Sequence, residues 1–296
     1  MSSDHLPVAE ASLEMSLPYT PAEIRDWLAL AFSNSIGGSP PSDDTRPLVL
    51  GELERLQGEV PAAVLARILE SAIVESSIKS QQFPSPEAQA QFVTSLLPTT
   101  WKIQLGDLGE AVALAVLEHL VGLWIPVAKL QLHQTRNETQ HGIDHVGLLI
   151  DSSGTLKSIW FVECKARTAM DSSEGVKACA ELVEQRKKSS NQVVNFVYHR
   201  IAEVNDSVAA QFFRYLVGGS DAPPCSEERG IFLMGDQSAW STATIPNLQS
   251  CQNCDRRDTD CNCSRHAFLL KQVNLRDSVI QIYHELGIEI NPDDTD

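Results

Sequence analysis

The sequence predicts a mixed α/β fold of the α+β type, whose core runs helix, three strands, helix, strand. Three observations predict it. Residues 105–121 carry apolar side chains at helical spacing, residues 141–167 hold two apolar runs of strand length joined by a polar loop, and residues 171–188 open with a capping-box pattern. A chain of 296 residues is long enough to bury a sizeable core around these elements.

The two apolar runs in residues 141–167 predict a β-hairpin. If residues 151–154 are the loop, Asp144 lies opposite Phe161. Side chains alternate between the two faces of a strand, so Glu163 and Lys165 share one face with Asp144. Glu163 is then a diagonal neighbour of Asp144, within about 8 Å. Two carboxylates and an ammonium therefore converge on one patch of an otherwise apolar hairpin.

This patch has a chemical use. Burying such charges costs several kcal/mol each unless they are paired or hold a metal ion. Asp144 and Glu163 offer the hard oxygen ligands that Mg²⁺ prefers, and Lys165 can orient or deprotonate a water beside that ion for phosphodiester hydrolysis. The alternative is an Asp–Lys–Glu ion pair on an exposed sheet face.

The predicted helix 105–121 adds a third acidic residue. Apolar residues stand three, four and seven positions after Glu110, so its carboxylate projects from the apolar face of the helix. Such a placement is costly and indicates a functional role. Gly106 and Gly109 would let the start of this helix lie close against the strands. The alternative is a glutamate near a helix N-terminus, favoured by the macrodipole by less than ~1 kcal/mol.

Residues 1–100 predict a helical packing or partner-docking region, which precedes a domain over residues 101–296. Within the first region, Val60–Ile78 has amphipathic helical spacing, and the pattern resumes over residues 87–97. No catalytic group of residues is evident there.

The remaining elements follow from local patterns. Trp124–His133 alternates as a first strand, Gly230–Met234 reads as a short buried strand, and Ser207–Val217 has helical spacing. Leu269–Leu286 predicts a C-terminal amphipathic helix. The segment 193–199 fits either a strand or a helix.

Four of the seven cysteines form a small cysteine-rich insertion near the C-terminus, over residues 251–263. They are Cys251, Cys254, Cys261 and Cys263. A CxxC pair and a CxC pair can supply four thiolates to a tetrahedral structural Zn²⁺, with His266 and Cys225 as substitutes. Free thiols and an iron–sulfur cluster are the alternatives.

The charge of the chain is unusual for a protein that approaches DNA. The net charge is −16, although residues 101–216 contribute only −1. Acidic flanks oppose the counterion release that drives DNA binding. They indicate either that a partner delivers the DNA, or that the flanks restrain the site, or that they keep the protein soluble. No signal peptide and no apolar run of membrane-spanning length is evident, so no membrane is expected as a partner and the cytoplasm is the expected location.

Asp144 followed by Glu163-Cys164-Lys165 resembles the PD-(D/E)XK nuclease superfamily, although isoleucine rather than proline precedes Asp144. The resemblance implies a restriction-endonuclease-like αβββαβ core. It also implies that Asp144, Glu163 and Glu110 bind Mg²⁺, that Lys165 serves the attacking water, and that the carbonyl of Cys164 is a further ligand.

A narrower resemblance covers about residues 100–220. Gly-Asp-Leu-Gly-Glu110, His-Gly-Ile-Asp144 and Phe-Val-Glu163-Cys-Lys165 are together similar to HamA, the nuclease subunit of Hachiman antiphage defence. That family is a PD-(D/E)XK effector paired with a helicase subunit, which restrains it until aberrant or invading DNA is sensed.

The site residues and the family resemblance together predict a Mg²⁺-dependent DNA endonuclease. Its active site would contain Glu110, Asp144, Glu163 and Lys165. His141, His145 and Arg167 are candidates for supporting contacts. Two alternatives stand beside this prediction. One is a non-catalytic protein of the same fold that binds nucleic acid or a partner, and the other is an RNase.

Overall fold

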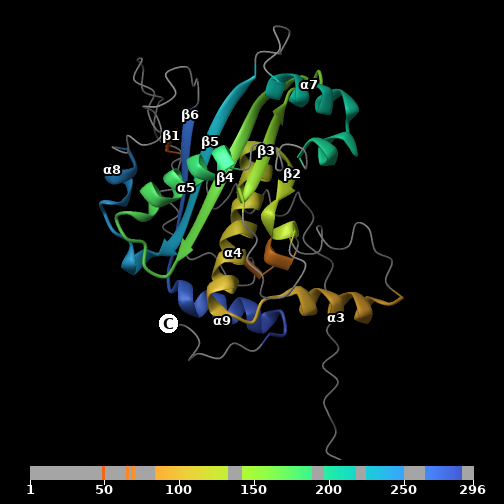
Figure 1. Cartoon of the computed structure of the whole chain (residues 1–296). Helices are drawn as coiled ribbons and strands as arrows, with labels where there is room; N and C mark the ends of the chain where they lie inside the picture. Colours follow the sequence, from red (N-terminus) through yellow and green to blue (C-terminus); the bar gives the residue numbers. More distant parts are fainter. Residues whose placement is uncertain are drawn as a thin grey trace, which may run out of the picture.

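A computed structural model describes residues 49–50, 65–66, 68–70, 72, 84–132, 142–188, 197–217, 225–249 and 264–288. Within these residues, a six-stranded mixed sheet with the order β1-β6-β5-β4-β3-β2 forms the centre (Figure 1). The strands are β1 (Val49–Leu50), β2 (Trp124–Ala128), β3 (His145–Ile150), β4 (Leu156–Arg167), β5 (Ser226–Asp236) and β6 (Ser264–Gln272). The β2–β3 and β3–β4 pairs are antiparallel, and β4–β5, β5–β6 and β1–β6 are parallel. The predicted mixed α/β class is confirmed.

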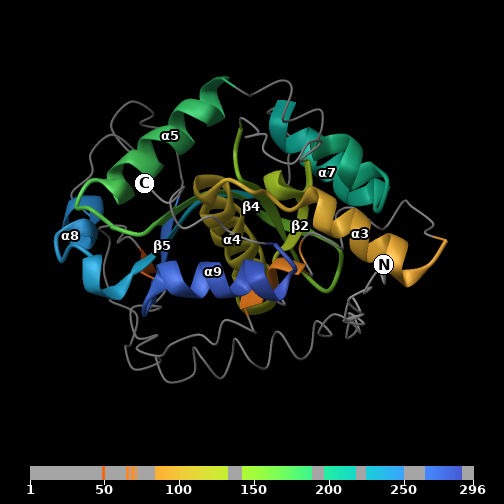
Figure 2. The same cartoon turned by 90° about the horizontal axis from the view of Figure 1, so that it is seen from below.

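Helices cover both faces of this sheet, as Figure 2 shows from below. The helices are α3 (Pro86–Leu96), α4 (Trp101–Val116), α5 (Glu174–Lys188), α7 (Asp206–Val217), α8 (Thr244–Gln249) and α9 (Leu275–Glu285), with short helical turns η2 (Leu117–Val121), η3 (Lys129–Leu132) and η4 (Gln237–Ala239). The apolar residues of α4 and α9 pack on one face, and those of α5, α7 and α8 pack on the other. The elements follow the predicted order of helix, three strands, helix, strand.

Strand β4 is buried on both faces, which explains its nearly continuous apolar run. Trp160 and Val162 pack with α4, whereas Ile159 and Phe161 pack with α5 and α7. Alternation continues to the end of the strand, where Ala166 also faces α4. Glu163, Lys165 and Arg167 therefore lie in the C-terminal half of a strand whose position is fixed from both sides.

Helix α4 approaches β4 closely at one glycine. A Cβ atom added to Gly109 would lie 2.7 Å from the Cβ atom of Ala166, a distance that real Cβ atoms do not adopt. A Cβ atom added to Gly106 would meet no atom within 4 Å. The predicted close approach is therefore confirmed at Gly109 and wrong at Gly106, which lies beside open space.

The register of the β3–β4 hairpin differs from the prediction by two residues. His145 pairs with Val162, so the next position along the ladder sets Asp144 beside Glu163 rather than opposite Phe161. One residue of the shift comes from the turn, which extends to residue 155, and the other from an irregularity at residues 149–150. Because the shift is two residues, the side chains that share a face are unchanged.

Two other element boundaries were wrong. Strand β2 ends at Ala128, where the chain enters the 3₁₀ turn η3, instead of continuing to His133. Residues 269–272 belong to strand β6 rather than to the C-terminal helix, which begins at Leu275. A short apolar run that is buried on both sides carries no periodicity that separates a strand from a helix. Of residues 193–199, which the sequence left undecided, the described part, 197–199, is helical.

The described parts of residues 1–100 are mostly helical, apart from β1 and the residues that flank α3. Leu65, Ile68 and Leu69 lie on helical backbone and pack in the same apolar cluster as α4. The predicted domain boundary at residue 100 stays a prediction, and the cysteine-rich segment 251–263 lies outside the described residues. Every helix among the described residues is too short or too polar to cross a membrane.

The contact at Gly109 predicts a difference between two glycines of one helix. Gly109→Ala should lower the free energy of unfolding by about 1–3 kcal/mol, because an added methyl group must push α4 away from β4. Gly106→Ala should leave stability unchanged or raise it by up to about 1 kcal/mol, because alanine favours the helix and meets no neighbour. Urea denaturation of both variants measures this, and equal effects would contradict the close packing.

Candidate active site

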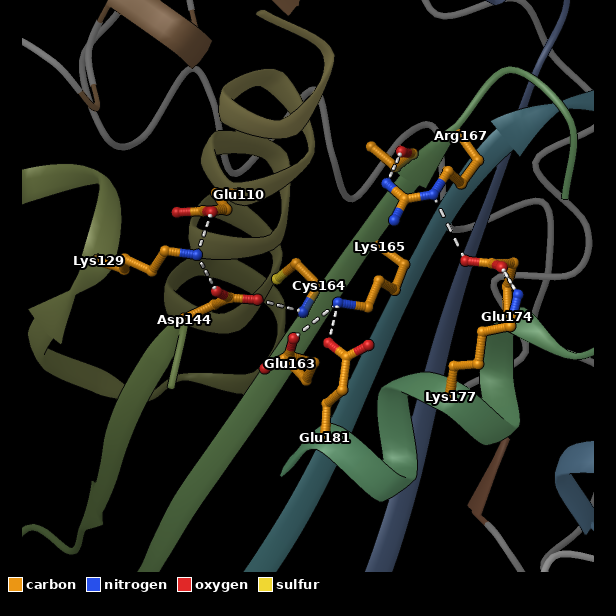
Figure 3. Close-up of polar contacts among 11 residues, drawn as sticks. Glu110, Lys129, Asp144, Glu163, Cys164, Lys165, Arg167, Glu174, Lys177 and Glu181 are labelled. Atoms are coloured by element: carbon orange, nitrogen blue, oxygen red, sulfur yellow. Dashed lines mark hydrogen bonds and ion pairs between the residues drawn. The ribbon is translucent and has the colours of Figure 1, made fainter. Parts of the chain in front are cut away.

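The site forms where strands β3 and β4 separate. Asp144 directly precedes β3, and its side chain reaches across to β4, where the backbone N–H of Cys164 donates a hydrogen bond to Oδ2 at 2.7 Å. The backbone N–H of Lys129 donates to the carbonyl oxygen of Asp144, also at 2.7 Å. The Cys164 N–H thus fixes the carboxylate of Asp144, as Figure 3 shows, and the Lys129 N–H fixes its backbone.

Glu163 and Lys165 lie two residues apart on β4, as the alternation predicts. The ammonium of Lys165 donates to Oε1 of Glu163 at 2.9 Å and also contacts Oε2 of Glu181 on α5. Only 12% of the Lys165 side chain is exposed. The amine is therefore held between the strand and α5 instead of pointing into bulk solvent.

Glu110 comes from α4 and is buried, as the sequence predicts. An ammonium joins it to the strands, because Nζ of Lys129 lies 3.2 Å from Oε1 of Glu110 and 2.8 Å from Oδ1 of Asp144. Figure 3 shows Lys129 between these two carboxylates.

The four predicted residues line one cavity of about 460 Å³. Its lining residues are Thr100, Lys102, Ile103, Gly106, Asp107, Glu110, Lys129, Asp144, Glu163, Cys164, Lys165, Ala166 and Arg167. The structure therefore brings together acids and an amine that are spread over 56 positions of sequence, from Glu110 to Lys165.

Burial dominates the electrostatics of the acids. It raises the pKa of Glu163 to about 8, with the negative charge of Asp144 adding to the effect and Lys165 opposing it. Burial also raises the pKa of Glu110 well above its usual range, and Lys129 opposes this shift. Both carboxyl groups are costly to ionise without a further positive charge.

Two buried carboxylate oxygens point to such a charge. Oε2 of Glu110 and Oε2 of Glu163 have no hydrogen-bond partner among the described residues. Buried polar atoms are normally paired, so an unpaired acceptor in a cavity calls for an explanation such as an ion or water. A divalent cation would satisfy acceptors of this kind.

The donor set fits Mg²⁺ through two carboxylates rather than three. Among the described residues, no three acidic, histidine or cysteine side chains are already gathered around one point. Mg²⁺ commonly uses one or two carboxylates together with water and substrate phosphate. Asp144 and Glu163 satisfy that requirement, and Cys164 lines the cavity with them. Lys129 contacts both Asp144 and Glu110, and the part of Glu110 as a third ligand stays a prediction.

Sequence reasoning missed Lys129 and Asp107, two cavity residues whose charges act on Glu110. Lys129 is a single charge within the apolar stretch around β2, which is the signal that could have identified it. Asp107 lies three positions before Glu110 and therefore on the same helix face. Burial raises the pKa of Asp107 to about 7, with Lys129 opposing the shift.

The supporting candidates have different environments. His145 is fully buried beside the site, and burial lowers its pKa to about 4, so its ring is neutral at pH 7. Arg167 lines the cavity while its Nε lies 3.4 Å from the buried Glu174 at the start of α5. His141 and the four cysteines of the predicted Zn²⁺ site lie outside the described residues, so their roles stay predictions.

Comparison with known proteins gives one finding about family. The family model named HamA matches residues 60–283, which is more than half of the chain and spans every residue that lines the cavity. No curated protein matches the chain.

The raised pKa values predict a pH dependence of stability. Glu163 binds its proton more tightly in the folded protein than its usual value of 4.5 allows, so the folded state is favoured at low pH. The free energy of unfolding should therefore fall as pH rises from about 5 to about 8, by up to ~1.4 kcal/mol per pH unit for one proton.

Denaturation across this pH range tests the dependence in metal-free protein. Glu163→Gln should reduce the slope, because it removes one of the titrating groups. Glu203→Gln, at a side chain that is 60% exposed, is the matched control and should keep the wild-type slope. A slope that is unaffected by Glu163→Gln would show that this carboxyl group does not titrate as described.

Proposed function

The chain belongs to the HamA family, and from this premise we propose that it is the nuclease effector of a Hachiman-type antiphage defence system. Family membership itself gives the chain a role in antiphage defence. The proposal adds the reaction, which is the Mg²⁺-dependent hydrolysis of phosphodiester bonds within DNA.

One observation carries the proposal. Glu110, Asp144, Glu163 and Lys165 line the same cavity, and two of the three acids present a buried oxygen with no partner among the described residues. A protein that only binds nucleic acid gains nothing from burying acids in the surface that meets phosphates, because negative charge opposes that contact. Metal-dependent hydrolysis requires such acids.

The acidic residues of the cavity would serve as metal ligands. Asp144 and Glu163 would hold Mg²⁺ with the carbonyl of Cys164, and Glu110 would stand beside them. When bound, Mg²⁺ would polarise the phosphate and lower the pKa of an attacking water. Asp144 is suited to this task, since the Cys164 N–H fixes its carboxylate before any ligand arrives.

Lys165 orients the nucleophile instead of removing its proton. Burial alone would lower the pKa of Lys165, but the carboxylates of Glu163 and Glu181 outweigh burial and raise it. The amine is therefore protonated at neutral pH and acts as a hydrogen-bond donor. Two of its three N–H groups meet Glu163 and Glu181, which leaves the third for the water or a phosphate oxygen.

The net negative charge of the chain supports a partner that brings DNA to the site. The chain carries −16, and the cations that line the cavity are Lys102, Lys129, Lys165 and Arg167. Two of these, Lys129 and Lys165, are paired with acids of the site, which leaves little attraction for a long polyanion. The helicase-type subunit implied by the family resemblance would supply the missing affinity and restrain cutting until DNA is sensed.

The nuclease assignment predicts that Lys165→Ala abolishes cutting of DNA. The rate of Mg²⁺-dependent cleavage should fall by about 100-fold or more, since the water and the phosphate lose their donor. Lys157→Ala is the matched control on the same strand. Its side chain is 50% exposed and pairs with Asp151 at the hairpin turn, so the rate should not change.

The assay uses linear and circular DNA and single-stranded RNA, with and without the helicase-type partner. Far-UV circular dichroism checks that both variants are folded. Cleavage of RNA but not DNA would identify an RNase. Wild-type protein that cuts neither substrate with any divalent metal or partner would identify a non-catalytic binding protein.

A further inference from the structure

We propose that Lys129 takes the place of a second divalent cation between Glu110 and Asp144, so that this cavity holds one metal ion rather than two. The inference rests on the proposed function and deepens it. Many nucleases use two metal ions about 3.5–4 Å apart, and a pair of ions requires carboxylates on both sides. The carboxylates for two ions are present here, but an ammonium already lies between two of them.

Lys129 is fixed in this position by contacts at both ends. Its Nζ contacts Oδ1 of Asp144 at 2.8 Å and Oε1 of Glu110 at 3.2 Å, and its backbone N–H donates to the carbonyl of Asp144 at 2.7 Å. The side chain is 19% exposed. A lysine held through its backbone and its ammonium by the same residue does not swing away at low cost.

The charges around Lys129 explain why it stays. Its ammonium lies within contact distance of the carboxylates of both Glu110 and Asp144, and their negative charges favour a positive charge at this place. Asp107 lines the same part of the cavity and adds to the negative surroundings. Removing the ammonium would leave these acids without a positive charge between them, at a cost that a divalent cation could relieve.

The unpaired oxygens are distributed in agreement with a single ion. Oε2 of Glu163 has no partner in the described part of the chain. Each carboxylate oxygen of Asp144 accepts one hydrogen bond there, from Lys129 and from Cys164, which leaves lone pairs for one cation. On the other side, Lys129 takes Oε1 of Glu110, so Oε2 is the one oxygen of that carboxylate without a partner among the described residues. Lys129 thus acts as a positioning residue that holds Glu110 and Asp144 and contributes a fixed positive charge beside the metal.

Counting bound Mn²⁺ tests the inference without any cleavage assay. Full-length protein is stripped of metal and titrated with Mn²⁺, and free Mn²⁺ is followed by electron paramagnetic resonance. Mn²⁺ prefers oxygen ligands, which reduces binding by cysteines. The ions bound in the cavity are identified as those that no longer bind in the Asp144→Asn variant. Wild type should bind one, whereas Lys129→Met and Lys129→Gln should each bind two.

Three further variants locate the effect. Lys129→Arg keeps the charge and should bind one ion, and Lys129→Met combined with Glu110→Gln should return to one. Lys177→Met is the matched control, because Lys177 also bridges two acids, Glu174 and Asp171, but outside the cavity. It should leave the count at one. The Lys129→Gln variant keeps hydrogen-bond donors at position 129, so the ion count can still be measured if the Lys129→Met variant does not fold.

Each other outcome overturns the inference. Two cavity ions in wild type, one ion in both neutral Lys129 variants, or an added ion in Lys177→Met would show that Lys129 does not replace a cation, while the proposed nuclease function would stand. No cavity ion in wild type would overturn both proposals.

Discussion

The site depends on how the fold compensates the carboxylates that it buries. Glu110, Asp144 and Glu163 are each less than a tenth exposed, and two ammonium groups meet them, Lys129 on one side and Lys165 on the other. Compensation is incomplete, because one oxygen of Glu110 and one of Glu163 have no partner among the described residues. An arrangement that satisfied every charge would be more stable, but it would have nothing to offer a metal ion or a phosphate.

The fold holds these groups in place with two local irregularities. Strands β3 and β4 separate beyond the pair of His145 and Val162, which frees the N–H of Cys164 to bind the side chain of Asp144. Gly109 lets α4 approach β4 at Ala166, which brings the helix that carries Glu110 against the end of the strand. The apolar clusters on both faces of the sheet keep these elements rigid around the cavity. Precise placement on helices and strands is what catalysis requires.

The sequence predicted most of the site because its members follow simple periodicities. Glu163 and Lys165 share a strand face at a spacing of two, and Glu110 stands on the apolar face of a helix. Asp144 kept its face although the hairpin register was wrong, because the turn and the bulge together shift the ladder by an even number. Lys129 could not be found in this way. It follows a strand in a 3₁₀ turn, and its partner Asp144 is 15 residues away. The error at β6 has a similar origin, since its apolar run is buried on both sides and shows no period.

The central claim is that the acids of this cavity hold a divalent cation, and locating that cation tests it most directly. Crystals of the full-length protein soaked in Mn²⁺ would show the ion by its anomalous scattering. The account predicts one peak bound by the carboxylates of Asp144 and Glu163, at oxygen distances near the ~2.1 Å that Mg²⁺ requires. A cavity with no anomalous peak at saturating Mn²⁺, or an ion bound only at other acids of the chain, would contradict it.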